Sequence, residues 1–129
     1  MNGKRPSILI VEDDRKVLRI LTRQLSSEGY AILQAENGKE AEDIAVSNRP
    51  DLVILDIRLP DYDGIQILEH LMSIDNTIKV VILTGYGTQE IVRSAMEIGA
   101  IDFLTKPFEP DELSAVVREV LVSEPSAVR

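Results

Sequence analysis

Acidic, hydroxyl and basic side chains stand directly after four separate apolar runs of this sequence. Three consecutive acids, Glu12 to Asp14, follow the first run, and Asp56, Thr84 and Lys106 each end or follow a later one. Carboxylates gathered in one place repel one another, so such a cluster requires a cation or a shifted protonation. Oxygen ligands of this kind suit Mg²⁺, which often bridges to phosphate. These residues therefore predict a divalent-metal site suited to phosphate chemistry, if the fold brings them together.

Each of these residues also has an ordinary structural explanation when it is taken alone. An acid after a strand often caps the next helix, which is what we expect of Asp14. Asp56 would be a loop residue before a turn at positions 59–61, and Thr84 would be a turn residue. Lys106 would be a solvated loop lysine. What favours chemistry is that all four positions fall at the same end of different strands.

The elements that must position these residues alternate regularly along the chain. Apolar β-rich runs predict strands at 8–11, 31–35, 52–55, 80–83 and 100–104, and three of them are continuous enough to be buried on both faces. Apolar residues spaced three or four apart predict helices with buried stripes at 17–25, 41–45, 65–72, 91–98 and 113–121. Five such units predict an α/β fold with a parallel sheet, helices on both faces and right-handed crossovers. If the strand order is 2-1-3-4-5, the crevice lies beyond the carboxyl ends of strands 1 and 3.

Boundary signals agree with these elements. Asn37 followed by Glu40 predicts a capping box. Gly29 and Gly99 stand where two helices should end, and Pro110 suits a first helical turn.

Length and composition restrict the kind of protein. The 129 residues predict one domain over residues 7–122, with tails at 1–6 and 123–129. The net charge of −8 argues against non-specific binding of nucleic acid. No apolar run is long enough to span a bilayer, and no signal peptide is evident. The absence of cysteine is compatible with a reducing cytoplasm. Because signal peptide and spanning segment are both lacking, we expect a cytoplasmic protein without membrane partners.

Four blocks of the sequence together resemble the signature of two-component response-regulator receiver domains. They lie in order at residues 8–14, 55–64, 83–85 and 103–108, and the resemblance extends over residues 7–122. It implies a flavodoxin-like (βα)5 doubly wound sheet with strand order 2-1-3-4-5. It also implies a phosphoacceptor in a phosphorelay, which receives a phosphoryl group from a histidine kinase or phosphotransfer protein.

The same resemblance assigns the metal and acceptor positions. It implies that Asp56 accepts the phosphoryl group and helps to bind Mg²⁺, for which Mn²⁺ is a possible substitute. Asp13 would bind the metal directly, Glu12 mostly through water, and Arg58 through its backbone carbonyl. Arg58 and Tyr86 occupy variable positions that tune dephosphorylation in this family.

The resemblance further implies a set of switch residues. The Thr84 hydroxyl would bond the phosphoryl group, Lys106 would pair with it, and Phe103 would be the aromatic switch residue. The Lys106–Pro107 peptide bond would be cis. Phosphorylation would remodel the face formed by the fourth helix, fifth strand and fifth helix, which is also a candidate homodimer surface. The signal would pass to an output domain in a longer chain or to a downstream protein.

Three other functions are alternatives for a sequence of this kind. A phosphatase of the haloacid-dehalogenase type has a second aspartate two residues after the first, where this sequence has Arg58. A flavodoxin-like cofactor carrier needs a Ser-, Thr- and Gly-rich first loop, whereas Glu12 to Asp14 would repel the cofactor phosphate. A constitutive interaction module is the third alternative. We therefore expect no enzyme activity beyond the domain's own Mg²⁺-dependent phosphorylation and dephosphorylation.

Overall fold

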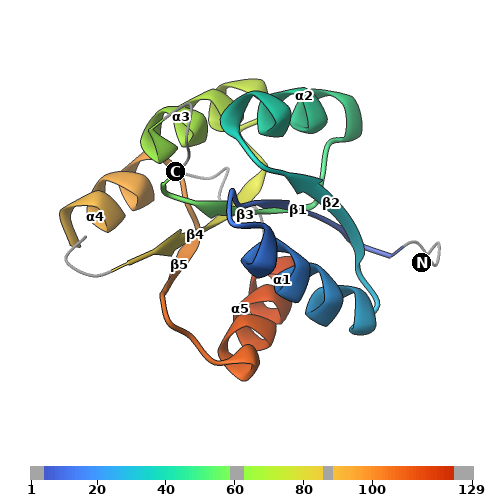
Figure 1. Ribbon diagram of the computed structural model, residues 1–129. Helices are drawn as coiled ribbons and strands as arrows, with labels where there is room; N and C mark the ends of the chain where they lie inside the picture. Colours follow the sequence, from blue (N-terminus) through green and yellow to red (C-terminus); the bar gives the residue numbers. More distant parts are fainter. Residues whose placement is uncertain (1–4, 59–62, 86–88, 124–129) are drawn as a thin grey trace.

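The computed structural model describes residues 5–58, 63–85 and 89–123, which form five βα units in series (Figure 1). The predicted turn at 59–61 and Tyr86 lie outside these residues. The strands are β1 (Ser7–Val11), β2 (Ala31–Ala35), β3 (Leu52–Asp56), β4 (Lys79–Thr84) and β5 (Asp102–Thr105). The helices are α1 (Arg15–Ser27), α2 (Gly38–Asn48), α3 (Gly64–Ile74), α4 (Gln89–Ile98) and α5 (Pro110–Val122).

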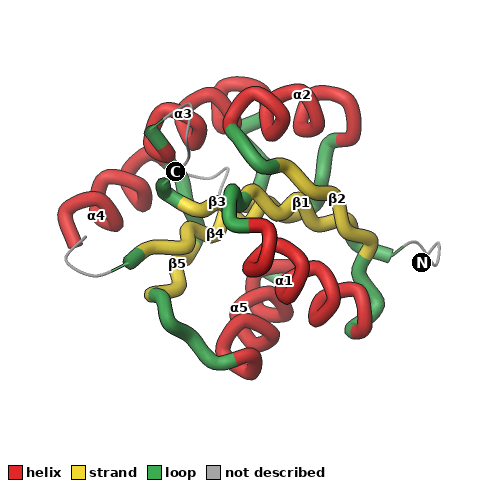
Figure 2. Tube along the Cα trace, in the orientation of Figure 1, coloured by secondary structure: helices red, strands yellow, loops and turns green. Residues whose placement is uncertain are grey.

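The five strands form one parallel sheet with the order β2-β1-β3-β4-β5, which confirms the predicted flavodoxin-like α/β fold. Helices α2, α3 and α4 cover one face of the sheet, and α1 and α5 cover the other (Figure 2). Asp56 pairs in register with Leu83, and Thr84 pairs with Thr105. The carboxyl ends of the strands therefore meet at one rim.

Two hydrophobic clusters lie on opposite faces of the sheet, and neighbouring residues of one strand belong to different clusters. Leu9 and Val11 pack in the cluster beneath α2, α3 and α4, whereas Ile8 and Ile10 pack in the one beneath α1 and α5. This alternation explains why the central strands read as unbroken apolar runs, since both of their faces are buried. The sheet is thereby held rigidly beneath its rim.

The helix ends follow local signals with one exception. Asp14 caps α1 as predicted, accepting hydrogen bonds from the amides of residues 16 and 17. The capping box predicted for α2 is only half formed. Asn37 accepts a hydrogen bond from the amide of Glu40, but the Glu40 carboxylate accepts one from the amide of Glu36 instead of Asn37. The chain enters α2 in an extended conformation, with φ of −156° at Asn37, and this brings the preceding amide to the glutamate.

The helix boundaries predicted at three other residues are confirmed. Gly29 and Gly99 have φ of 99° and 142° just beyond α1 and α4, a region that favours glycine. Pro110 begins α5. The predicted fifth strand was placed too early, because the amides of Gly99 and Ala100 both bind the carbonyl of Ala95 and still belong to the end of α4.

Helix α4 is held to the core less firmly than the sequence indicated. Ala95 is its only buried residue among those described, whereas Ile91 in the predicted buried stripe is 38% exposed. Helix α3, in contrast, buries four residues (Gly64, Ile67, Leu68 and Leu71). No helix in the described part of the chain is long and apolar enough to cross a membrane.

Candidate functional site

Three carboxylates meet at the rim where β1 and β3 end. Glu12 and Asp13 follow β1 directly, and Asp56 is the last residue of β3. Each of the three offers one oxygen, and these oxygens all lie within 4.8 Å of one another. Because β1 and β3 are adjacent parallel strands, the sheet topology itself makes this cluster.

Glu12 is the most deeply buried member of the cluster, with 1% of its surface exposed. Its Oε2 accepts a hydrogen bond of 3.2 Å from the amide of Asp14, and its Oε1 lies 3.2 Å from Lys106 Nζ. Burial, followed by the hydrogen bond and the charge of Asp56, raises the pKa of Glu12 to about 7. This carboxyl group therefore changes its charge near neutral pH, where an ordinary glutamate is fully ionised.

Asp56 is also buried, with 6% of its surface exposed, and both of its oxygens have partners. Oδ1 accepts a hydrogen bond of 2.9 Å from the amide of Arg58, and Oδ2 lies 3.1 Å from Lys106 Nζ. Asp13 lies on the exposed side of the cluster. The buried carboxylates are thus fixed by protein groups, and the third faces solvent.

Lys106 supplies the positive charge at the rim. Its Nζ contacts both Glu12 and Asp56, while its backbone amide donates a hydrogen bond of 2.7 Å to the carbonyl oxygen of Thr84. Burial alone would lower the pKa of Lys106, but the hydrogen bonds and charges of Asp56 and Glu12 outweigh it and raise the pKa above its usual value. The lysine therefore stays charged and offsets part of the repulsion between the two acids. The peptide bond between Lys106 and Pro107 is cis, as expected.

The ligands that this cluster offers suit a hard divalent cation. The three side chains provide carboxylate oxygens, without a histidine or cysteine in the cluster. Such ligands favour Mg²⁺ or Mn²⁺ over the softer transition metals. The Arg58 amide is bound to Asp56, which keeps this residue beside the cluster, but the expected role of its carbonyl stays a prediction.

The predicted switch residues lie on the neighbouring strands. Thr84 ends β4 and is buried, with its Oγ1 3.5 Å from the carbonyl oxygen of Gly85. Phe103 lies on the edge strand β5 and is 40% exposed. The rim thus brings Thr84 near the acidic cluster through the backbone of Lys106, whereas Phe103 is at the surface. The expected switch roles of Thr84 and Phe103 stay predictions.

Sequence reasoning did not identify two features that shape the site. The first is the direct contact between Lys106 and Glu12, which arises only when β1 and β5 share a rim. The second is Gly64, whose amide donates a hydrogen bond of 3.0 Å to the carbonyl of Ile57. A Cβ atom at Gly64 would lie 2.3 Å from that carbonyl oxygen, so only glycine fits. The Asp63-Gly64 pair before an apolar helical stripe was the available signal, since aspartate before glycine marks a helix start.

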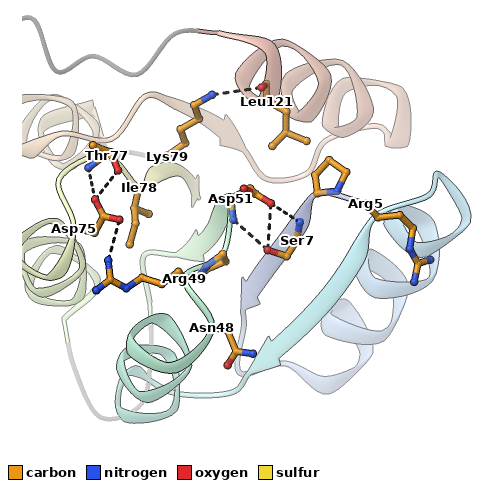
Figure 3. Close-up of a pocket in the computed structure, with 12 residues that line it drawn as sticks. Arg5, Ser7, Asn48, Arg49, Asp51, Asp75, Thr77, Ile78, Lys79 and Leu121 are labelled. Carbon is orange, nitrogen blue, oxygen red and sulfur yellow. Dashed lines mark hydrogen bonds and ion pairs between the residues drawn. The ribbon is translucent and has the colours of Figure 1, made fainter. Parts of the chain in front are cut away.

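A cavity lies at the opposite end of the sheet, where the strands begin (Figure 3). It measures ≈ 730 Å³, and four of its charged side chains have partners within the protein (Arg49, Asp51, Asp75 and Lys79). Asp51 binds Ser7, Arg49 binds Asp75, and Lys79 Nζ donates to the carbonyls of residues 120, 121 and 123 at the end of α5. We therefore place the candidate site at the acidic rim, where buried charges converge, and not in this cavity.

Comparison with known proteins agrees with the fold. Residues 8–118 match the family model of the response regulator receiver domain. The chain is 41% identical over 121 residues to sporulation initiation phosphotransferase F of Bacillus subtilis, covering 94% of this chain and 95% of that protein. It is 39% identical to response regulator MprA of Mycolicibacterium vanbaalenii over 114 residues, which make up 88% of this chain and 49% of that regulator. The chain thus spans about half of the MprA regulator and nearly all of the sporulation protein.

Solved structures give the same result. A CheY-like receiver domain protein of Methanospirillum hungatei superposes with a TM-score of 0.88 at 30% identity, covering 92% of this chain and 94% of that one. The receiver domain of NtrX from Brucella abortus superposes with a TM-score of 0.87 at 32% identity, covering 91% and 99%. The match to the family model extends over most of the chain, and the parallel sheet has the same strand order as predicted. This chain belongs to the response-regulator receiver domain family.

Proposed function

We propose that this receiver domain accepts a phosphoryl group on Asp56 in a Mg²⁺-dependent reaction. The observation that supports the proposal is the placement of Asp56 between two other carboxylates and a lysine, with oxygens of all three acids within 4.8 Å of one another. A buried carboxylate so close to other acids is retained only where positive charge can offset it. Phosphoryl transfer requires that kind of positioning and charge compensation.

The residues of the rim have distinct roles in phosphoryl transfer. A carboxylate oxygen of Asp56 attacks phosphorus, the bond from phosphorus to the donor breaks, and an acyl phosphate forms. The Arg58 amide and Lys106 Nζ hold the two Asp56 oxygens in place for this attack. Glu12, Asp13 and Asp56 would hold Mg²⁺, which would supply positive charge to offset the charge of the cluster and of the phosphoryl group. Once the phosphoryl group is present, Lys106 is within reach of both the group and Asp56.

The conformational response would start at Thr84. Its hydroxyl would donate a hydrogen bond to the new phosphoryl oxygens, and the end of β4 would follow. Phe103 would then turn from the surface toward the space vacated by Thr84, which would alter the α4–β5–α5 face. Phosphorylation thereby shifts the population between two states of that face, which is where a downstream partner or a second copy of the chain would bind.

The partners follow from the chemistry of the family. Response-regulator receiver domains interact with histidine kinases or phosphotransfer proteins. For this chain we infer such a donor, an output through a further domain or a downstream protein, and a cytoplasmic location. The domain would act on no external substrate, because Arg58 stands where a phosphatase of the haloacid-dehalogenase type has its second aspartate.

The proposal is tested by phosphorylating the protein with acetyl phosphate and Mg²⁺ and measuring its mass. Wild-type protein should gain one phosphoryl group, and the Asp56→Asn variant should gain none. Asp111→Asn, which removes the same charge from an exposed position on α5, should be labelled like wild type. Full labelling of Asp56→Asn would reject the assignment of the acceptor.

A further inference from the structure

Helix α1 has a net positive charge, whereas the remainder of the chain has a net negative charge. Its 13 residues include four basic ones and no acidic one (Arg15, Lys16, Arg19 and Arg23). The chain as a whole carries −8, so the residues outside α1 together carry −12. The positive charge of α1 would attract a negatively charged partner to this helix, because a local patch of one sign guides association.

The arginines of α1 line a groove of ≈ 450 Å³ between α1 and β2. Arg15, Arg19 and Arg23 follow one another at intervals of four residues and so lie on one side of the helix. The groove is completed by Leu18 and Thr22 of α1 and by Gln34 and Glu36 at the sheet. β2 is one of the two edge strands, so within the described residues no further strand closes the groove on its outer side.

This groove is a different surface from the contact between α1 and α5. On that other flank Gln24 Nε2 donates hydrogen bonds of 2.8 Å to the carbonyl of Pro110 and to the hydroxyl of Ser114. On the groove side, α1 is tied to the sheet by a hydrogen bond of 2.8 Å from Gln34 Nε2 to Thr22 Oγ1. The groove also lies on the far side of the sheet from α4. It is therefore separate from the α4–β5–α5 face discussed above.

Arg19 and Arg23 form no ion pair within the described part of the protein. Arg15 Nε lies 3.2 Å from Glu36 Oε1, a pair whose arginine side chain is 80% exposed. Among residues 5–58, 63–85 and 89–123, no carboxylate forms an ion pair with Arg19 or Arg23. Both side chains are exposed. Their guanidinium groups can therefore bind two carboxylates from outside, each through paired hydrogen bonds.

The spacing of these groups specifies the shape of the ligand. Residues four apart on a helix are separated by about 6 Å along its axis. Alternate side chains of an extended polypeptide point the same way and are about 6.6 Å apart. We propose that the α1–β2 groove is a docking site for an extended acidic polypeptide segment with carboxylates at alternate positions, which bind Arg19 and Arg23. A nucleic acid fits this surface less well, because its continuous phosphate backbone would also meet the negative charge of the remaining protein.

The test uses the unphosphorylated protein and a defined peptide, so its outcome does not depend on the proposed phosphorylation. The probe is a fluorescein-labelled peptide of about eight residues in which glutamate alternates with threonine, since an extended segment of that length spans the groove. Fluorescence anisotropy would measure its affinity for wild type and for Arg19→Glu/Arg23→Glu. The matched control is Arg93→Glu/Arg118→Glu, which makes the same change in net charge at exposed positions on α4 and α5.

Wild type should bind the peptide, and the affinity should fall at least about tenfold in the groove variant and less than about twofold in the control, because the interaction is local. Added salt should weaken binding by wild type, since exposed charges are screened. Amide shifts in ¹⁵N NMR spectra should cluster on α1 and β2. The proposal would be overturned if both variants lost affinity equally. It would also be overturned if a peptide with glutamine in place of glutamate, or single-stranded DNA, bound as tightly as the acidic peptide, or if the amide shifts were centred on α4. The absence of any binding by wild type at protein concentrations of about 1 mM would overturn it as well.

Discussion

The backbone amide of Lys106 donates a hydrogen bond of 2.7 Å to the carbonyl oxygen of Thr84. The two residues whose side chains are proposed to contact the phosphoryl group are thus joined through their main chains, at the ends of adjacent strands. The Lys106 ammonium group in turn contacts Glu12 and Asp56. A change in the charge or position of Asp56 can therefore affect Thr84 through the Lys106 side chain and the hydrogen bond from the Lys106 amide to Thr84.

The pKa of Glu12 should depend on the charge of Asp56. Burial is the largest cause of the raised pKa, and the hydrogen bond and charge of Asp56 raise it further. Asp56→Asn should therefore lower the pKa of Glu12 without returning it to its ordinary value, because burial remains. A ¹³C NMR titration of the glutamate carboxyl carbons would measure this shift, with Asp111→Asn as the control. An unchanged pKa would mean that the two carboxyl groups are not coupled.

The stability of the metal-free protein should fall as the pH rises through the titration of Glu12. The folded pKa of about 7 lies above the ordinary 4.5, so the folded state holds this proton more tightly than the unfolded state. The stabilising contribution is complete below pH 4.5 and is lost as the pH approaches and passes 7. Relative to Glu12→Gln, which stays neutral, wild type should lose about 1–3 kcal/mol of unfolding free energy over this range.

Urea unfolding at a series of pH values would measure this difference. Lys106 does not interfere, because the stability from its raised pKa is lost only above its ordinary value of 10.5. Mg²⁺ should stabilise wild type more at pH 8 than at pH 6, because protonation competes with metal for the same carboxylate. Parallel stability curves for wild type and Glu12→Gln would contradict the assignment.

Replacement by alanine should affect metal binding at Asp13 and stability at Asp14. Asp13 contributes an oxygen to the acidic cluster, so Asp13→Ala should weaken Mg²⁺ binding at least about tenfold. Asp14 caps α1, so Asp14→Ala should cost about 1 kcal/mol of stability and leave metal affinity nearly unchanged. Titration with Mn²⁺ followed by electron paramagnetic resonance, together with thermal unfolding, would separate the two effects. Equal metal affinity in wild type and Asp13→Ala would exclude this ligand.

Gly64→Ala should destabilise the protein strongly. The new Cβ would lie 2.3 Å from the Ile57 carbonyl oxygen, and relief requires movement of the backbone that follows Asp56. We expect a loss of about 3 kcal/mol or more, as in other overpacked sites. Gly85→Ala is the control, because a Cβ there would meet no atom of residues 5–58, 63–85 and 89–123 within 4 Å, and its cost should be below about 1 kcal/mol. Denaturant unfolding of both variants would decide whether close approach at Gly64 is required.

Local patterns in the sequence predicted the sheet and its helices because each element carries its own signal. The unbroken apolar run at 8–11 marks a strand buried on both faces, and Asp14 marks the start of α1. Strand ends also predicted which residues share the rim. The strand order itself came from the family resemblance, since the periodicity of each element is compatible with several orders.

Features that depend on distant residues were not accessible in this way. The contact between Lys106 and Glu12 joins the beginning and the end of the chain. The raised pKa of Glu12 depends on how completely the rim buries its carboxylate, which no local pattern specifies. The half-formed box at Asn37 shows the same limit at short range, because the Glu40 carboxylate had two amides within reach and bound the one before the cap.

The small buried surface of α4 has a consequence for local opening of the fold. Ala95 is the only fully buried residue of this helix among those described, with Ile98 packed partly buried against the core, and the helix follows the strand that ends at Thr84. A segment with few buried apolar contacts separates from its neighbours at little cost in free energy. Amide hydrogen exchange should therefore be faster in α4 than in α3, which buries four residues. The region of the domain that is easiest to rearrange adjoins the rim on the side of Thr84.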